Sequence, residues 1–221
     1  MTTQIDFEQA RFNMIEQQIR TWEVLDQNVL NLLQEIHRED FVPDEYRQLA
    51  LADLNIPLAN GQVMMTPKLE ARLLQALAIL KSDNVLEIGT GSAYLTALLA
   101  RSANHVDSVD IFSNFGTDAL SKLERYEINN VDLHTGDALS EWRSDKQHDV
   151  IVVTGSLPKI IPALQEQLRN GGRLFAIVGE SPVMEARLVT RIDAEKYADE
   201  ALFETDLPPL IGIEKSSLFQ F

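Results

Sequence analysis

Residues 84–94 read Asn-Val-Leu-Glu-Ile-Gly-Thr-Gly-Ser-Ala-Tyr, and this stretch decides the fold. Val85 to Ile88 is an apolar run of strand length, and the residues from Ala93 to Ala100 are typical of a helix. Gly89 and Gly91 stand between them. Glycine accepts positive φ angles and lets a ligand approach the backbone, and a helix that begins there points free N–H groups into the turn. The stretch therefore predicts an α/β sheet with a ligand at the carboxyl end of this strand.

The residues around Gly91 separate the ligands that use such a turn. A dinucleotide site has a third glycine where this chain has Tyr94, and a Walker loop ends in Gly-Lys-Ser/Thr, which is absent here. The remaining pattern, Glu-x-Gly-x-Gly, resembles the first motif of class I methyltransferases that use S-adenosylmethionine. This resemblance implies that Gly89 and Gly91 lie beside the methionyl part of the cofactor and Glu87 near its cationic end. A plain turn between strand and helix is the alternative.

Composition limits the class of protein and of partner. The 221 residues allow one α/β domain with an N-terminal extension, and 45% hydrophobic with 24% charged residues is typical of a globular protein. A formal net charge of −15 repels phosphates, so we expect no nucleic acid partner. Cysteine is absent, which excludes disulfides and a cysteine nucleophile. The four histidines show no ligand spacing along the chain, so no metal is expected.

The location is predicted from the apolar segments. Met1 to Asp6 has neither the basic region nor the apolar core of a signal peptide. No apolar run approaches the roughly 20 residues that a membrane span needs. We therefore expect a cytoplasmic protein without a membrane segment.

The pattern predicts helices before the glycine turn and alternating strands and helices after it. Asp26 is expected to cap a helix, Asn60-Gly61 to form a turn, and Thr66-Pro67 to begin a further helix as N-cap and first residue. Helices are predicted over 7–20, 27–36, 67–80, 118–126 and within 158–168, and strands over 85–88, 105–109, 131–134, 149–153, 173–178, 187–192 and 197–205, the last two as an antiparallel pair. We expect a mostly parallel, doubly wound sheet of about seven strands in residues 81–221, with a helical layer and substrate loop in residues 1–80, as one compact unit.

Several stretches in this order resemble the protein-L-isoaspartate O-methyltransferases over about residues 7–207. They are Met-Ile-Glu-Gln-Gln-Ile at 14–19, Arg-Glu-Asp-Phe-Val-Pro at 38–43, Ile-Pro-Leu at 56–58 with Gly-Gln at 61–62, the glycine turn, Gly-Asp at 136–137, Asp-Val-Ile-Val-Val-Thr at 149–154, and Ile-Pro, Gln-Leu and Gly-Gly-Arg-Leu between 161 and 174. The resemblance implies the class I methyltransferase fold. It also implies transfer of the methyl group of S-adenosylmethionine to the α-carboxylate of an isoaspartyl residue in a damaged protein or peptide.

The implied reaction requires few catalytic side chains. A carboxylate with a pKa near ~3.5 is ionised at neutral pH. An in-line displacement by this nucleophile needs no general base, so positioning and desolvation carry the catalysis. The lack of a histidine or cysteine constellation therefore does not count against an enzyme.

An acid is expected at the end of each of the first three strands. Asp110 follows Glu87 by 23 residues, where an acid binds both ribose hydroxyls, with a helix cap as the alternative. By resemblance Asp137 flanks the adenine, with an Asx turn as the alternative. Thr154 ends the fourth strand and either lines the reacting methyl or satisfies the strand end. The predicted cofactor set is Glu87, Gly89, Thr90, Gly91, Ser92, Asp110, Ile111, Asp137 and Ala138.

The chain departs from the family in the predicted substrate loop. After Gly-Gln the family usually reads Thr-Ile-Ser-Gln-Pro, whereas this chain reads Val-Met-Met-Thr-Pro at 63–67, which places Met65 where the active-site serine stands. A thioether cannot donate a hydrogen bond, and the neighbouring Thr66 is expected to use its hydroxyl as a helix cap. Two methionines predict an adaptable apolar wall or plain core packing. The candidate residues around the reacting groups are Met65, Thr66 and Thr154.

Two smaller departures are expected to matter little. Ala93 stands where the family has a third glycine, and it is small. Asp110 stands where the family more often has glutamate, and it keeps the acid.

Three functions stay open. The chain is an isoaspartyl methyltransferase that tolerates Met65, a methyltransferase of the same fold that acts on a different acid or a small molecule, or a cofactor-binding module without turnover that serves a partner. Position 65 is the one that separates them, and it weakens the first.

Overall fold

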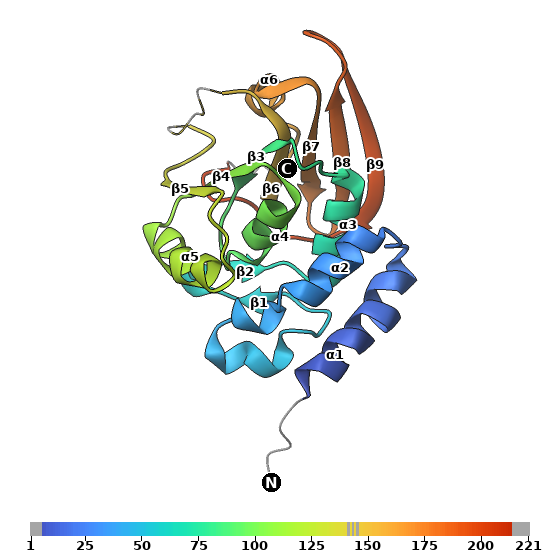
Figure 1. The fold of residues 1–221 in the computed structure, drawn as a ribbon. Helices are drawn as coiled ribbons and strands as arrows, with labels where there is room; N and C mark the ends of the chain where they lie inside the picture. The colour runs from blue at the N-terminus through green and yellow to red at the C-terminus, as the bar shows by residue number, and fades with distance from the viewer. Residues whose placement is uncertain (1–5, 141, 143, 145, 214–221) are drawn as a thin grey trace, which may run out of the picture.

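The computed structural model describes residues 6–213 except 141, 143 and 145. A seven-stranded sheet in the order β5-β4-β3-β6-β7-β8-β9 forms its centre (Figure 1). The strands β3, β4, β5, β6 and β7 are parallel, and β8 and β9 pair antiparallel at one edge, as predicted. The strand order reverses beside β3, which is where open sheets bind ligands. The bounds are Asn84–Ile88 (β3), His105–Asp110 (β4), Val131–Thr135 (β5), His148–Leu157 (β6), Leu168–Glu180 (β7), Val183–Arg191 (β8) and Tyr197–Thr205 (β9).

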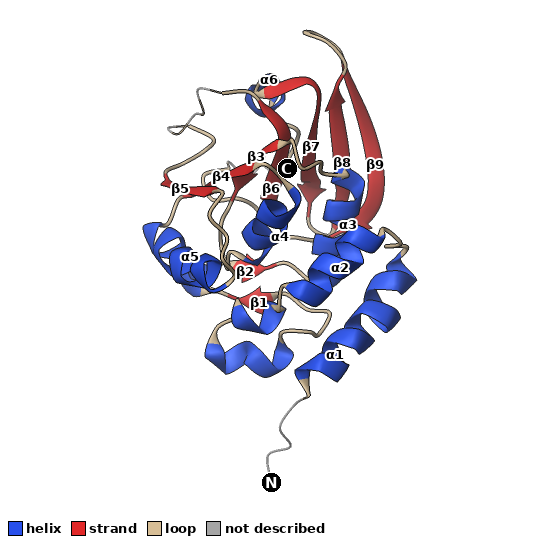
Figure 2. Cartoon of the chain, viewed as in Figure 1, coloured by secondary structure: helices blue, strands red, loops and turns tan. Residues whose placement is uncertain are grey.

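Both faces of the central strands are buried, because alternate residues of a strand point to opposite faces. Val85, Val150 and Val152 belong to one apolar cluster, and Leu86 and Ile151 belong to the other. Helices α3 (Pro67–Leu77), α4 (Tyr94–Ser102) and α5 (Ser113–Arg125) lie on one side of the sheet (Figure 2). Their side chains belong to the first cluster. The second face carries only the short α6 (Pro162–Glu166) among the described helices, and irregular segments cover the rest of it.

Three helices differ from the prediction by more than one residue at an end. One is α3, which ends at Leu77 instead of residue 80 and leaves Leu80 exposed. The predicted helix 7–20 is α1 (Phe7–Met14) followed by a π-helical turn, Ile15–Ile19, and a 3-10 turn, Arg20–Trp22. The wider π turn keeps Ile15 and Ile19 buried, so the apolar face continues through it. Helix α5 begins five residues before the predicted start, because Phe115 is buried and packs against Phe112 with the ring centroids 6.1 Å apart.

The N-terminal layer lies at one end of the sheet, where the blue and cyan elements gather in Figure 1. It holds α2 (Gln27–Glu35), which Asp26 caps through Asn28 N–H at 2.8 Å as predicted. The short strands β1 (Ile56–Pro57) and β2 (Val63–Met64) pair across the predicted turn. Buried residues from both sides of position 80 form a single apolar cluster, so layer and sheet share one core. None of the described helices is both long and apolar enough to cross a membrane.

Candidate functional site

A cleft opens at the carboxyl ends of the central strands. It is partly open to solvent and is lined by residues from β3, β4 and β6 and from the loops that follow β3, β4 and β5. Val63, Gly89, Gly91 and Thr154 line both this outer part and a smaller inner part, so the two are continuous. The outer part also includes Asp110, Ile111, Phe112, Phe115, Asp137, Ala138 and residues 207–211, and the inner part includes Met64, Met65, Glu70, Glu87, Thr90 and Ser92.

The glycine turn is shaped for close approach to the backbone. Gly89 has φ +100°, and a Cβ built there would lie 2.1 Å from Thr154 Oγ1. Gly91 has φ +49°, a left-handed value that other residues adopt only at a cost. The Thr154 hydroxyl lies 2.9 Å from the carbonyl oxygens of Ile88 and Gly89. Thr154 therefore satisfies the strand end and lines the cleft at the same time.

Ala93 corrects one expectation. It has φ 67° and ψ 9°, and it is fully buried directly before α4. The family's glycine at this position suits a left-handed backbone, a property that side-chain size alone does not reveal. The conformation makes alanine unfavourable here by roughly 1–2 kcal/mol.

Glu87 is a buried acid with one oxygen unpaired. Its Oε2 accepts hydrogen bonds from the hydroxyls of Thr96 and Ser108, both at 2.6 Å. Its Oε1 has no hydrogen-bond partner among the described residues. Burial raises the pKa of Glu87 to about 8, although the two hydroxyls act against this shift. An unpaired buried carboxylate oxygen beside the glycine turn fits a ligand with a cationic group, such as S-adenosylmethionine.

Asp110, at the end of β4, and Asp137, shortly after β5, accept hydrogen bonds from neighbouring loops. Asp110 accepts from Gly91 N–H at 3.0 Å and from Phe112 N–H at 2.9 Å, and burial raises its pKa. Asp137 accepts from Leu139 N–H at 2.8 Å and from the Ser140 hydroxyl at 2.7 Å, which is the Asx turn given as the alternative. Both acids line the cleft.

Met65 and Thr66 face different spaces. Met65 is buried, lines the inner cleft, and has its carbonyl held by the guanidinium of Arg38. Thr66 occupies the N-cap position of α3 with Pro67 after it, so the predicted start of this helix is confirmed. Its side chain makes no cap hydrogen bond, so the predicted role of its hydroxyl is wrong. Its side chain instead lines a separate surface cavity with Trp22 and Phe203, and Thr66 is not among the residues of the cleft.

Arg38 fixes the backbone at Met65. It is 1% exposed, forms an ion pair with Glu70, and donates to the carbonyl of Ala50 at 2.8 Å. Its guanidinium lies 5.1 Å from the centre of the Tyr94 ring. The arginine of the family stretch 38–43 thus joins the substrate loop to α3 and α4.

Sequence reasoning missed one wall of the cleft. The run Leu207–Ile211 lines it from the side of β6. Ser156 N–H donates to Pro208 O at 2.9 Å, and Leu210 N–H donates to Ser156 O at 3.1 Å. A Cβ on Gly155 would lie 2.8 Å from the Leu210 side chain, so glycine is needed for this contact. Pro208-Pro209 after the last strand was the available signal, since prolines favour an extended path.

Known proteins share both the sequence and the fold. The family model described as protein-L-isoaspartate(D-aspartate) O-methyltransferase matches residues 9–213. Protein-L-isoaspartate O-methyltransferase of Rhodopseudomonas palustris is 36% identical over 202 residues, which are 91% of this chain and 93% of that protein. Protein-L-isoaspartate O-methyltransferase 2 of Pelobacter propionicus is 36% identical over 208 residues, 94% and 92% of the two chains.

A solved structure supports the fold. A putative protein-L-isoaspartate O-methyltransferase from Plasmodium falciparum, in complex with S-adenosyl-L-homocysteine, matches with a TM-score of 0.78 at 16% identity and covers 94% of this chain and 99% of that chain. The predicted class I methyltransferase fold is therefore confirmed. With the family model and relatives matched over more than nine-tenths of its length, the chain belongs to the protein-L-isoaspartate O-methyltransferase family, whose members are S-adenosylmethionine-dependent O-methyltransferases.

Proposed function

We propose that this protein binds S-adenosylmethionine in the cleft and methylates isoaspartyl carboxylates of damaged proteins, at a rate that Met65 lowers. The observation that carries the cofactor assignment is the unpaired buried oxygen of Glu87 beside two glycines with positive φ. The cofactor supplies a methyl group activated on a sulfonium. The substrate class follows from the family.

Each part of the cleft receives a role in this proposal. Glu87 holds the cationic amino group, and the turn residues Gly89, Thr90, Gly91 and Ser92 pass close to the methionyl part. Asp110, which lines the cleft, accepts from the ribose hydroxyls. Asp137 and Ala138 flank the adenine, and Ile111 gives it an apolar contact. The neighbouring Phe112 and Phe115 widen this apolar surface.

The inner cleft is where the methyl acceptor meets the activated methyl. Met64 and Met65 exclude water there, which favours reaction between two opposite charges. Neither thioether donates to the incoming carboxylate, and the Thr154 hydroxyl is held at the backbone of β3. Thr66 is not one of the residues of the cleft. We therefore assign it no role in the chemistry.

One observation favours a second candidate function. The buried Met65 makes the inner wall apolar where the family presents a hydroxyl. A less polar acid loses less hydration free energy on contact with such an apolar wall than a peptide carboxylate does. A methyltransferase that acts on a different acid or small molecule is the second candidate.

A cytoplasmic location and the absence of a nucleic acid partner stay predictions, which cell fractionation and a binding assay with nucleic acid would test.

The deciding experiment compares two peptides that differ in one linkage. One contains isoaspartate and the other contains aspartate at the same position, and transfer of label from S-adenosylmethionine is measured with the full chain. We expect slow transfer to the isoaspartyl peptide alone. Cofactor binding measured by calorimetry without transfer to either peptide would contradict the substrate, and a lack of cofactor binding would contradict the site.

A further inference from the structure

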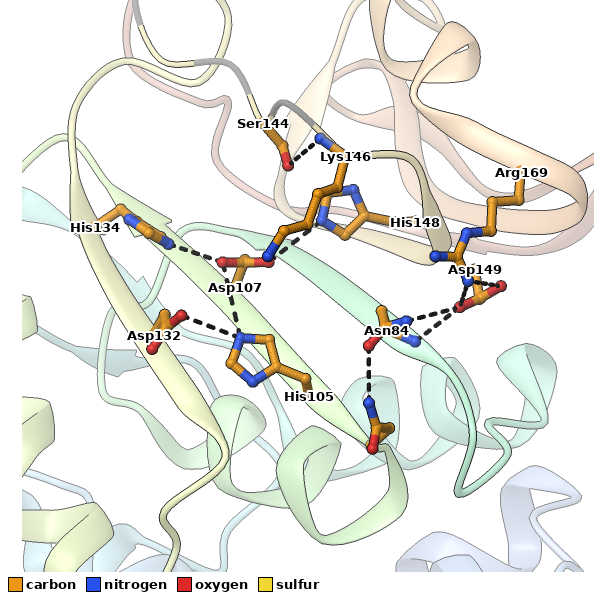
Figure 3. Close-up of polar contacts among 11 residues, drawn as sticks. Asn84, His105, Asp107, Asp132, His134, Ser144, Lys146, His148, Asp149 and Arg169 are labelled. Carbon is orange, nitrogen blue, oxygen red and sulfur yellow. Dashed lines mark hydrogen bonds and ion pairs between the residues drawn. The ribbon is translucent and has the colours of Figure 1, made fainter.

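Three of the four histidines converge on the carboxylate of Asp107 (Figure 3). His134 Nε2 lies 2.9 Å from Asp107 Oδ1, and His148 Nε2 lies 3.4 Å from Asp107 Oδ2. His105 Nε2 lies 3.9 Å from Asp107 Oδ1 and 3.3 Å from Asp132 Oδ2. The spacing of the histidines along the chain did not indicate this cluster, because its members come from three strands.

Strand register brings the cluster together. His105 and Asp107 lie two residues apart on β4, so their side chains share one face of the sheet. Asp132 on β5 is the register partner of Asp107, and His134 follows it by two residues. His148 begins β6. These side chains stand on paired strands rather than on loops, so their spacing is set before any ligand arrives.

We propose that His105, Asp107 and Asp132 bind one Zn²⁺ ion or a chemically similar first-row transition metal. One donor atom from each residue lies within 4.8 Å of the other two. Zinc bonds of about 2.0–2.2 Å place tetrahedral ligand atoms about 3.3–3.6 Å apart. The 3.3 Å contact of His105 with Asp132 already has this separation, and the 3.9 Å contact with Asp107 needs only a small side-chain rotation. Water fills the remaining position.

The two other histidines orient the central ligand. Metal sites commonly hold their carboxylates with such outer hydrogen bonds, and His134 and His148 contact both oxygens of Asp107. His148 is 1% exposed and its Nδ1 has no partner among the described residues. Its Nε2 faces Asp107, so Nδ1 lies on the other side of the ring from the proposed ion, and the imidazole acts on the site through Asp107 alone. The Asp132 side chain is 63% exposed, which leaves the ion a route from solvent.

Donor chemistry selects the ion. Imidazole suits zinc and its neighbours in the first transition row, whereas Mg²⁺ and Ca²⁺ prefer sites made only of oxygen. Lys146 lines the same cavity, so its ammonium group competes with the ion. A bound ion would join the edge strand β5 to β4. Asp107 precedes Asp110 by three residues, about 10 Å along the same strand, so the ion would also stiffen the strand that carries a cleft acid.

The test uses the full chain without a histidine tag, stripped with a chelator that is then removed. Titration calorimetry with ZnCl₂ is expected to give one site per chain, and zinc is expected to raise the melting temperature. His105→Ala and Asp132→Asn are each expected to weaken zinc binding at least roughly tenfold, since each removes a direct ligand. The control is His37→Ala, which removes the histidine outside the cluster and should leave zinc affinity unchanged. MgCl₂ should bind at least roughly tenfold more weakly than zinc.

Three results would overturn the proposal. They are a wild-type chain that takes up no zinc, wild-type zinc affinity in either ligand variant, and magnesium binding as tight as zinc binding. Asp132 is largely exposed, so Asp132→Asn tests the site in a chain that keeps its fold.

Discussion

At the scale of single residues, Met65 has the largest expected effect on activity. A hydrogen bond to a charged carboxylate contributes about 1.5–3 kcal/mol, which is roughly 10- to 150-fold in rate if it forms in the transition state. Met65→Ser is therefore expected to raise isoaspartyl methylation by one to two orders of magnitude, measured as kcat/KM with the isoaspartyl peptide.

Met64→Ser is the matched control for this variant. It also removes a buried thioether beside the cleft. Its kcat/KM therefore measures the effect of weaker packing in the apolar wall without a hydroxyl at position 65. Equal gains in both variants, or no gain in Met65→Ser while it still binds cofactor and melts cooperatively, would show that position 65 does not limit the reaction.

Ala93 has an expected effect on stability. Its left-handed backbone costs about 1–2 kcal/mol with a Cβ present, and the greater freedom of glycine in the unfolded chain returns about 0.4–1 kcal/mol of this. We expect Ala93→Gly to stabilise the fold by about 0.5–1 kcal/mol, a rise of roughly 1–4 °C in melting temperature. Ala97→Gly inside α4 should lower the melting temperature. The prediction fails if both variants lower the melting temperature equally.

Glu87 couples cofactor binding to pH. Its pKa of about 8 in the folded protein exceeds the ordinary 4.5, so the folded apoprotein keeps a proton that the unfolded chain has released. The contribution of Glu87 to the stability of the apoprotein should therefore fall as pH rises from about 4.5 to 8. A cationic group beside Glu87 favours the ionised form, so cofactor binding near pH 7 should release up to about one proton.

Calorimetry in buffers of different ionisation enthalpy measures this release. Glu87→Gln has no proton to lose and is expected to bind more weakly with no buffer dependence. A wild-type binding enthalpy that is the same in all buffers would refute the coupling.

At the scale of elements, the turn between β3 and α4 is expected to control binding without controlling the fold. Gly91→Val places a branched side chain at φ +49° in the cleft. We expect loss of cofactor binding in a thermal-shift assay. Gly116→Ala in α5 is the control, because no atom lies within 4 Å of its Cβ and helix propensity improves. Wild-type cofactor shifts in Gly91→Val would place the ligand elsewhere.

The elements also show what a sequence can predict. Strands buried on both faces, such as β6, are evident from their continuous apolar runs, and the acids at strand ends follow from the βα rule. The Asp26 cap was predicted correctly because the pattern is local. The cap by Thr66, the left-handed Ala93 and the π turn depend on how α3, α4 and the N-terminal layer pack, which local patterns do not contain.

Long-range contacts account for the other differences. Leu207–Ile211 reaches the cleft through pairing with Ser156, some fifty residues earlier in the chain. The histidines around Asp107 come from three strands, of which β4 and β5 pair directly and β6 lies beyond β3. Arg38 reaches Met65 across the N-terminal layer. The spacing of residues along the chain could not predict these contacts, because each contact joins residues that are far apart in the sequence.

At the scale of the whole molecule, the net charge of −15 sets a preference among substrates. A negative protein attracts basic peptides at long range, and salt screens the attraction because the Debye length falls from about 30 Å at 0.01 M to about 3 Å at 1 M. An isoaspartyl peptide flanked by lysines should have a several-fold lower KM than one flanked by glutamates at low salt.

The ratio of the two KM values is expected to approach one at high salt. Kinetics at several salt concentrations measure it, and the kcat values serve as the control because they should change little. A ratio that stays constant with salt would assign the preference to short-range contacts instead of charge.

The wall formed by Leu207–Ile211 has a consequence for protein synthesis. This run follows all seven strands in the chain, so a ribosome makes it after every strand of the sheet. A nascent chain can pair its strands while the cleft still lacks one side. S-adenosylmethionine in the cell then stabilises the finished protein in proportion to its concentration over Kd, but it gives little help to the chain while the sheet is still assembling.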